Sequence, residues 1–153
     1  MIDVYHNTVG RNCLLELDLT PDRSGLIPEE HTKQYKELGD FIRGCYGKPI
    51  KPDQEGEGEE DGVYRMKFNK PTRIDRISLM EDQSDGQVIR SFGVYGKNED
   101  ESEMKKLASG SSIGHKRILI FDEPASVSEV IVNTTFVDVP KWRSVSVHYC
   151  NEL

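Results

Sequence analysis

The apolar positions in the first third of the chain follow a helical period. The residues that carry it, at i, i+3, i+6 and i+7, are Tyr35, Leu38, Phe41 and Ile42. This spacing puts the four side chains on one face of a helix. Pro28 suits the first helical position, and the two glutamates after it favour the positive end of the helix dipole. We predict a helix over residues 28–44 that stops at Gly44.

A short apolar run precedes this helix. Leu14–Leu19 alternates apolar with acidic residues and ends at Thr20-Pro21-Asp22, a typical turn sequence. We predict a buried strand here, so that residues 1–46 contain one βα unit. A single βα unit cannot close a parallel sheet, because its strand needs neighbours on both sides. The strand is expected to pair with the rest of the chain, to join a second copy, or to fray.

From Val63 onward the apolar residues take the period of a strand. The alternating segments are 63–68, 73–80, 88–96, 116–122, 127–136 and 143–149. Such closely spaced strands, with Gly, Asp, Asn and Pro between them, favour an antiparallel β-sandwich over residues 62–153. The predicted core consists of Val63, Met66, Phe68, Ile77, Leu79, Phe92, Val94, Ile118, Ile120, Val130, Val132, Val145 and Val147.

Residues 47–61 separate the two parts and are rich in glycine, proline and acidic side chains. This composition is typical of a solvated linker. Clustered carboxylates can ligate calcium, but the spacing lacks the alternating ligands of an EF-hand loop. We therefore expect a linker and predict no metal or other cofactor.

The net charge of the chain excludes some classes of function. The chain has 20 basic and 27 acidic residues, a net charge of −7. An acidic protein lacks the basic face that binds nucleic acid or anionic membrane. No apolar run reaches the length of a membrane span, and the first ten residues do not resemble a signal peptide. Only 35% of the residues are hydrophobic, so we expect part of the chain to be solvated or to lack a surface it once packed against.

Two stretches resemble the α-L-fucosidase family of glycoside hydrolases. Pro21-Asp22, Gly25-Leu26-Ile27 and the helix ending near Arg43 are similar to the end of its catalytic barrel. A second signature, Ser-Gly-x-x-Ile-Gly-x-Lys-Arg, comprises Ser109, Gly110, Ile113, Gly114, Lys116 and Arg117. It resembles the family's C-terminal module, a discoidin-like, galactose-binding-like β-sandwich.

The resemblance implies a role without catalysis. Residues 1–46 would be the remnant of the last βα unit of a (β/α)₈ barrel, which needs roughly 250 residues. The family's two catalytic carboxylates would lie upstream, so we predict no catalytic residue here. The expected function is that of a C-terminal, non-catalytic module of an α-L-fucosidase, structural and a candidate for carbohydrate binding. The alternatives are a free-standing protein- or glycan-interaction domain and a hydrolase assembled from fragments.

The implied partners are an upstream catalytic barrel, glycans, and a second copy bound through the exposed βα unit. The family resemblance also suggests a lysosomal or secreted protein. Three cysteines cannot all pair within one chain, and none is in a CxxC motif. Which of them pair is left open.

Five residues are candidates for binding or modification. Trp142 could stack on a sugar ring, although core packing is the favoured interpretation. Lys116 and Arg117 could bracket a sugar or a carboxylate, although a surface position beside a tight turn is favoured. Glu81 is predicted to lie in an exposed turn. Asn133 begins an Asn-Thr-Thr glycosylation sequon, which is used only in the secretory route.

Other polar residues are expected to have no ligand role. His6, His31, His115 and His148 are scattered and are predicted to be surface or cap residues. Glu16 and Asp18 share a face of the predicted strand, and Asp18 is expected to be solvated or to pair within the turn.

Overall fold

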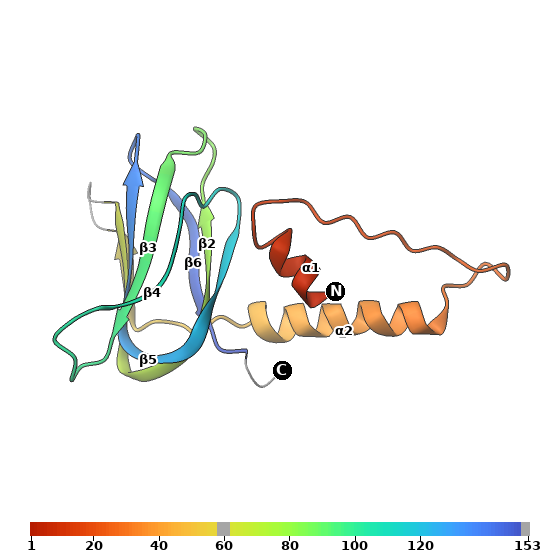
Figure 1. Cartoon of the computed structure of the whole chain (residues 1–153), viewed down its shortest axis with the longest axis horizontal. Helices are drawn as coiled ribbons and strands as arrows, with labels where there is room; N and C mark the ends of the chain where they lie inside the picture. Colours follow the sequence, from red (N-terminus) through yellow and green to blue (C-terminus); the bar gives the residue numbers. More distant parts are fainter. Residues whose placement is uncertain (58–61, 151–153) are drawn as a thin grey trace.

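A computed structural model describes residues 1–57 and 62–150. Figure 1 shows a β-sandwich from which a helical arm projects. The elements are α1 (Ile2–Asn7), α2 (Glu29–Tyr46), β1 (Gln54–Glu57), β2 (Val63–Glu81), β3 (Ile89–Lys97), β4 (Lys105–Gly110), β5 (Arg117–Phe136) and β6 (Trp142–His148). We call residues 1–46 the arm. The predicted antiparallel sandwich is confirmed.

Two long strands build both layers of the sandwich. The strand order is β1-β2-β5-β3-β4, with β6 also paired to β2, and all the pairings are antiparallel. Residues 63–67 of β2 pair with 129–133 of β5 in one layer, and residues 76–79 pair with 117–120 in the other. Register shifts in between allow the strands to bend from layer to layer.

These long strands differ from the short ones expected from the sequence. The predicted segments 63–68 and 73–80 are one strand, as are 116–122 and 127–136. Pro71 lies at a register shift of β2, where the missing backbone N–H costs no regular ladder bond. The alternating pattern predicted each of these segments as a strand. It did not predict that two successive segments form one long, bent strand.

All the predicted core residues are buried except Val63 and Ile120. The main core also holds residues that were not predicted, namely Ile74, Ile89, Ile113, Phe121 and Val127. Ile118 and Ile120 lie on the outer side of their layer, while Phe121 points into the main core. The arm covers Ile118 but leaves Ile120 49% exposed.

The predicted helix is confirmed as α2, which ends two residues later than expected. It begins directly after Pro28 and ends at Tyr46, with Gly47 as its C-cap. The helix continues past Gly44, so that Cys45 and Tyr46 reach the sandwich.

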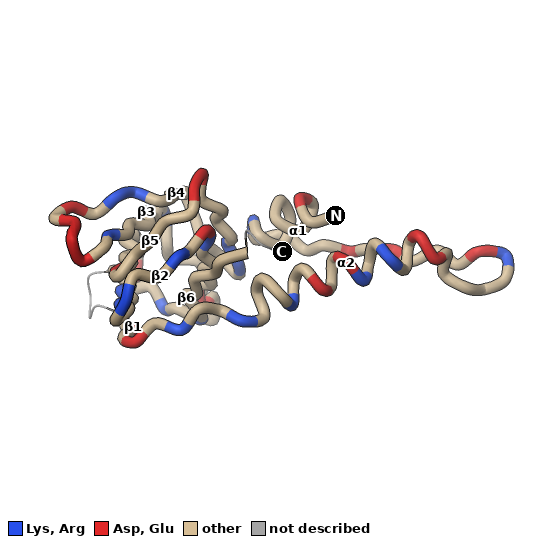
Figure 2. Tube along the Cα trace, turned by 90° about the horizontal axis from the view of Figure 1, so that it is seen from below, with Lys and Arg blue, Asp and Glu red and all other residues tan. Residues whose placement is uncertain are grey.

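The predicted strand Leu14–Leu19 is wrong. The segment has no β partner and runs alongside α2, as Figures 1 and 2 show. The Tyr35 hydroxyl donates to the Asp18 carbonyl oxygen at 2.7 Å, and Leu15 packs half-buried against the cluster that contains Leu38. Leu14 is 88% exposed. A strand of a parallel sheet needs neighbours, and the described part of the chain supplies none here.

A small apolar cluster and a disulfide attach the arm to the sandwich. Tyr5 and Leu38 of the arm pack on Ile118 of β5. The disulfide between Cys45 and Cys150 joins the end of α2 to the residues after β6. It closes a sequence separation of 105 residues, and loop entropy alone gives about 4–5 kcal/mol for a loop of that size.

The predicted linker is partly a strand. Residues 54–57 form β1 at the edge of the larger layer, paired with residues 64–67 of β2. The rest of the acidic run, residues 58–61, lies outside the described residues. Within the described ranges, no helix combines the length and the apolar character that crossing a bilayer requires.

Candidate functional site

Glu81 is buried, which corrects its predicted place in an exposed turn. It is the last residue of β2 and is 1% exposed. Its Oε1 accepts hydrogen bonds from the backbone N–H groups of Val88 at 2.6 Å and Ile89 at 3.0 Å. Its Oε2 accepts one from the Gly114 N–H at 3.1 Å. The carboxylate therefore ties the β2–β3 loop to the β4–β5 loop.

Trp142 packs against the core. It opens β6 directly opposite Glu81 on β2 and is half-buried. Its ring meets the Tyr64 ring edge-on, with centroids 5.6 Å apart. This geometry fits the core-packing interpretation favoured from the sequence.

Lys116 and Arg117 lie at the junction with the arm. The Lys116 ammonium is 3.5 Å from the Tyr5 hydroxyl and 5.9 Å from the centroid of the Tyr46 ring. Arg117 is half-buried, and its buried Nε has no hydrogen-bond partner among the described residues. Burial, aided by the nearby charge of Arg11, lowers the Arg117 pKa. The Lys116 side chain is thus turned toward the arm, whereas Glu81 and Trp142 are cross-strand neighbours within the sandwich.

The junction also contains His148, which was predicted to be a surface or cap residue. His148 is not a surface residue, because it is 2% exposed, but its ring contacts the last turn of α2 as a capping side chain does. Its Nδ1 lies 3.0 Å from the Cys45 carbonyl oxygen and its Nε2 3.0 Å from the Ser146 hydroxyl. Burial, together with the positive charges of Arg76 and Lys116, lowers the His148 pKa to about 4. His148 is therefore neutral at physiological pH.

His6 is the second histidine at this junction. Its Nε2 lies 2.6 Å from the Tyr46 hydroxyl, and its pKa is lowered, first by burial and then by Arg76. The other two histidines, His31 and His115, are exposed as predicted.

A buried ion pair that the sequence did not suggest supports the junction. The Arg76 guanidinium donates from Nε to Oδ1 of Asp75 at 2.9 Å and from NH2 to Oδ2 at 3.0 Å. The Cys150 N–H also donates to Oδ2 of Asp75, at 3.0 Å. Arg76 further donates to the Tyr46 hydroxyl at 3.4 Å. Such a bidentate pair is geometrically specific and holds the end of β6 against α2.

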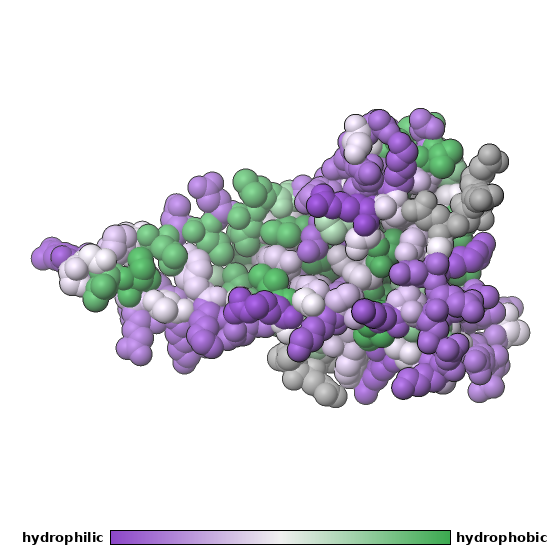
Figure 3. All heavy atoms as spheres, turned by 180° about the vertical axis from the view of Figure 1, so that it is seen from behind, coloured by the Kyte–Doolittle hydropathy of each residue, from purple (hydrophilic) through white to green (hydrophobic). Residues whose placement is uncertain are grey.

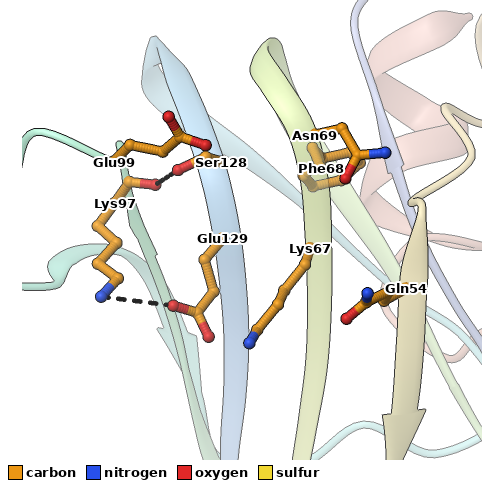
Figure 4. A pocket seen from close by; sticks show the side chains of 8 residues that line it. All are labelled: Gln54, Lys67, Phe68, Asn69, Lys97, Glu99, Ser128 and Glu129. Carbon is orange, nitrogen blue, oxygen red and sulfur yellow. Dashed lines mark hydrogen bonds and ion pairs between the residues drawn. The ribbon is translucent and has the colours of Figure 1, made fainter.

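A polar groove of about 390 Å³ crosses the outer face of the larger layer (Figure 4). It is lined by Gln54, Lys67, Phe68, Asn69, Lys97, Glu99, Ser128 and Glu129. Glu129 lies opposite Lys67 on one neighbouring strand and opposite Lys97 on the other, and Lys97 Nζ is 3.5 Å from its carboxylate. Phe68 is buried, so the groove offers hydrogen-bonding groups but no exposed ring. Four separate segments build it, and no local sequence pattern indicates that they converge.

The arm presents a second candidate surface, which is apolar. The exposed large hydrophobic residues of the arm are Met1, Ile2, Val4, Leu14, Leu17, Leu19 and Leu26. Figure 3 shows apolar side chains spread along the arm on the face seen from behind. We call this set the arm surface. Extended apolar patches on a protein surface mark contact sites.

Charged side chains along α2 pair with one another. Lys36 and Arg43 both pair with Asp40, at 2.7 and 2.8 Å. Figure 2 shows acidic and basic residues alternating along α2.

The described residues contain no cluster of side chains typical of a metal site. Among them, no three His, Cys, Asp or Glu residues are grouped so that they could hold an ion.

Known proteins match both parts of the molecule, although no family model matches the chain. Over 151 aligned residues it is 27% identical to α-L-fucosidase 1 of Arabidopsis thaliana, covering 79% of this chain and 30% of the plant protein. The structure of a candidate α-L-fucosidase from Bacteroides thetaiotaomicron is 29% identical, with a TM-score of 0.86. The chain is homologous to α-L-fucosidases.

The homology extends over the arm and the sandwich together. The Bacteroides α-L-fucosidase match covers 97% of this chain and 33% of the bacterial one. A Ruminococcus gnavus GH29 fucosidase, solved with fucose, has the same fold, with 21% identity and a TM-score of 0.85 over 99% of this chain and 36% of that one. The chain thus spans about a third of the length of these relatives. The resemblance inferred from the sequence is confirmed.

Proposed function

We propose that this chain is the C-terminal, non-catalytic module of an α-L-fucosidase and that its arm packs on the catalytic domain. One observation carries the proposal: the arm and the sandwich match an α-L-fucosidase structure as one unit, over 97% of this chain but only a third of the other. In this proposal residues 1–46 are the last βα unit of the barrel, residues 47–61 are a connection, and residues 62–153 are a discoidin-like, galactose-binding-like module.

The exposed arm surface supports this arrangement. Leu14, Leu19 and Leu26 are 88%, 49% and 69% exposed. Burying a leucine fully stabilises a protein by roughly 1.5–3 kcal/mol, so a domain that covers these residues gains substantially. The unpaired Leu14–Leu19 segment would then find the neighbouring strands that the described part of this chain does not provide.

The carboxylates of the described residues support a role without catalysis. A retaining glycosidase needs a nucleophile and an acid/base carboxyl about 5–5.5 Å apart. The two buried carboxylates, Asp75 and Glu81, are both engaged in hydrogen bonds that hold the fold. In the proposal the catalytic carboxylates belong to the preceding domain, and this module stabilises that domain.

A chimera tests the docking. This chain replaces the homologous third of the Bacteroides protein, and hydrolysis of an aryl α-L-fucoside is measured together with the thermal midpoint. We expect the chimera to fold and turn over substrate, and the isolated chain to be inactive. Leu14→Asp combined with Leu19→Asp should lower the midpoint of the chimera.

Val137→Asp is the matched control, because Val137 is 67% exposed on the sandwich and not on the arm. If both changes lowered the thermal midpoint of the chimera equally, docking through the arm would be contradicted. Turnover by the isolated chain that disappears when one of its carboxylates is changed would contradict the non-catalytic role.

The polar groove favours a second candidate function, glycan binding, whether the module is part of an enzyme or a free-standing interaction domain. Its lysine, glutamate and amide groups match the hydroxyls of a sugar, as in a ligand site with a few placed polar groups. A glycan array probed with the chain and with Lys67→Ala tests this. Binding should weaken in the variant, whereas Lys36→Ala on α2 should leave it unchanged.

A further inference from the structure

We propose that Asn133 is a site of N-linked glycosylation and that the first sugar of the glycan packs on the ring of Tyr95. This inference goes beyond the proposed function and does not depend on it. Asn133-Thr134-Thr135 is the one Asn-x-Ser/Thr sequence in the chain. A sequon by itself is a frequent motif, so the argument rests on where the fold places it.

The fold puts Asn133 on the outer face of the larger layer. Val130 and Val132 of β5 are fully buried in the core, so Asn133 and Thr135 point to the opposite side. Both residues are exposed. A glycan at this position extends into solvent without displacing a core side chain, although β5 is a central strand.

The strand next to Asn133 provides an aromatic surface. Asn133 pairs directly with Gly93 of β3, and Tyr95 lies two residues further along the same face. A Cβ atom added at Gly93 would lie 2.7 Å from Cε2 and 2.8 Å from the hydroxyl of Tyr95. The hydroxyl end of the ring therefore lies over Gly93, in the space that the side chain of any other residue would fill.

This arrangement brings the ring within reach of a sugar on Asn133. Directly paired residues of antiparallel strands have side-chain origins about 4.5–5.5 Å apart. Tyr95 is half-buried, so part of its side chain is open to solvent. The apolar face of N-acetylglucosamine matches such a ring, as aromatic side chains bury large area and keep a polar tip in water.

The disulfide gives an independent reason to expect the modification. Disulfides such as Cys45–Cys150 form in oxidising compartments and are rare in the cytosol. In eukaryotic cells the compartment that forms them is also the one in which sequons are glycosylated. The same route therefore supplies both the covalent link at the arm and the glycan on β5.

The transfer balances with a lipid-pyrophosphate-linked oligosaccharide as donor. The side-chain nitrogen of Asn133 forms a bond to the anomeric carbon of the first N-acetylglucosamine. The bond from that carbon to the pyrophosphate oxygen breaks, and the lipid pyrophosphate leaves with the electron pair. One amide proton is released, and no oxidation or reduction takes place.

The site is tested by secreting the full chain from a eukaryotic host and measuring its intact mass. We expect a glycan mass that peptide N-glycosidase removes, with Asn133 converted to Asp in the treated protein. Thr135→Ala should abolish the added mass, and Thr135→Ser, which keeps the sequon hydroxyl, should retain it. Secreted protein with the disulfide formed and no added mass would overturn the site.

The contact with Tyr95 has a separate readout. Removing the glycan from the native protein should lower the thermal midpoint by roughly 2–4 °C. The same treatment should leave the midpoint of Tyr95→Ala unchanged, while Tyr95→Phe, which keeps the ring, should behave as the native protein. Equal shifts in all three proteins would overturn the contact and leave the site itself in place.

Discussion

Replacing Glu81 should destabilise the sandwich far more than an average surface mutation. Glu81→Ala removes the acceptor for three backbone N–H groups, those of Val88, Ile89 and Gly114. A buried donor left without a partner costs about 1–3 kcal/mol. Water entering the vacated space offsets part of this, so we expect a loss of roughly 3–6 kcal/mol in the free energy of unfolding.

Glu81→Gln separates the shape of the side chain from its acceptor capacity. The amide oxygen can still accept from Val88 and Ile89, but the amide nitrogen then faces the Gly114 N–H, and two donors oppose each other. One charge-assisted bond is lost and one donor is left unpaired, which predicts a cost of about 2–3 kcal/mol. The expected order of stability is native, then Gln, then Ala.

Urea unfolding followed by tryptophan fluorescence measures these differences. Glu101→Ala is the matched control, because Glu101 is exposed and accepts a single backbone bond, from the Asn98 N–H at 2.8 Å. We expect the control to cost less than about 1 kcal/mol. If Glu81→Ala cost no more than Glu101→Ala, the inference that this carboxylate holds the two loops would be refuted.

Three further predictions concern the junction and the arm. Stability should fall as the pH drops from about 6.5 towards 4, because the unfolded chain protonates His148 while the folded chain, with its His148 pKa of about 4, does not; His148→Gln should flatten this slope in urea titrations. Replacing Cys45 and Cys150 by alanine should cost about 4–5 kcal/mol, and amide exchange should accelerate more in α2 than in β2. The isolated chain should self-associate through the arm surface, and sedimentation should show less association for Leu14→Asp.

The sequence by itself was sufficient to predict the helices and strands whose hydrophobic pattern depends on residues close together in the chain. The helical period around Leu38 predicted α2 because one turn of a helix decides which side chains share a face. Alternation in segments such as 127–136 identified the core side of each strand for the same reason. Both patterns depend only on neighbours within a few positions.

Other features depend on contacts with distant residues, which a local sequence pattern does not reveal. Leu14–Leu19 reads as a strand, but a strand exists only where another pairs with it. Glu81 reads as a turn residue, and its burial follows from three amides, of which Gly114 is 33 residues away. Hydrogen bonds to distant groups offset the cost of burying a carboxylate, and the sequence does not reveal those groups.

The junction between the arm and the sandwich shows the same division. The burial of His148 is not predicted from the sequence, because a lone histidine carries no periodic signal. Cys45 and Cys150 are 105 residues apart, and only the docking of α2 beside β6 makes them partners. The sequence thus determined which surfaces are apolar and which secondary structure carries them. The tertiary structure decided which of those surfaces meet, because burial and pairing depend on contacts between segments far apart in the chain.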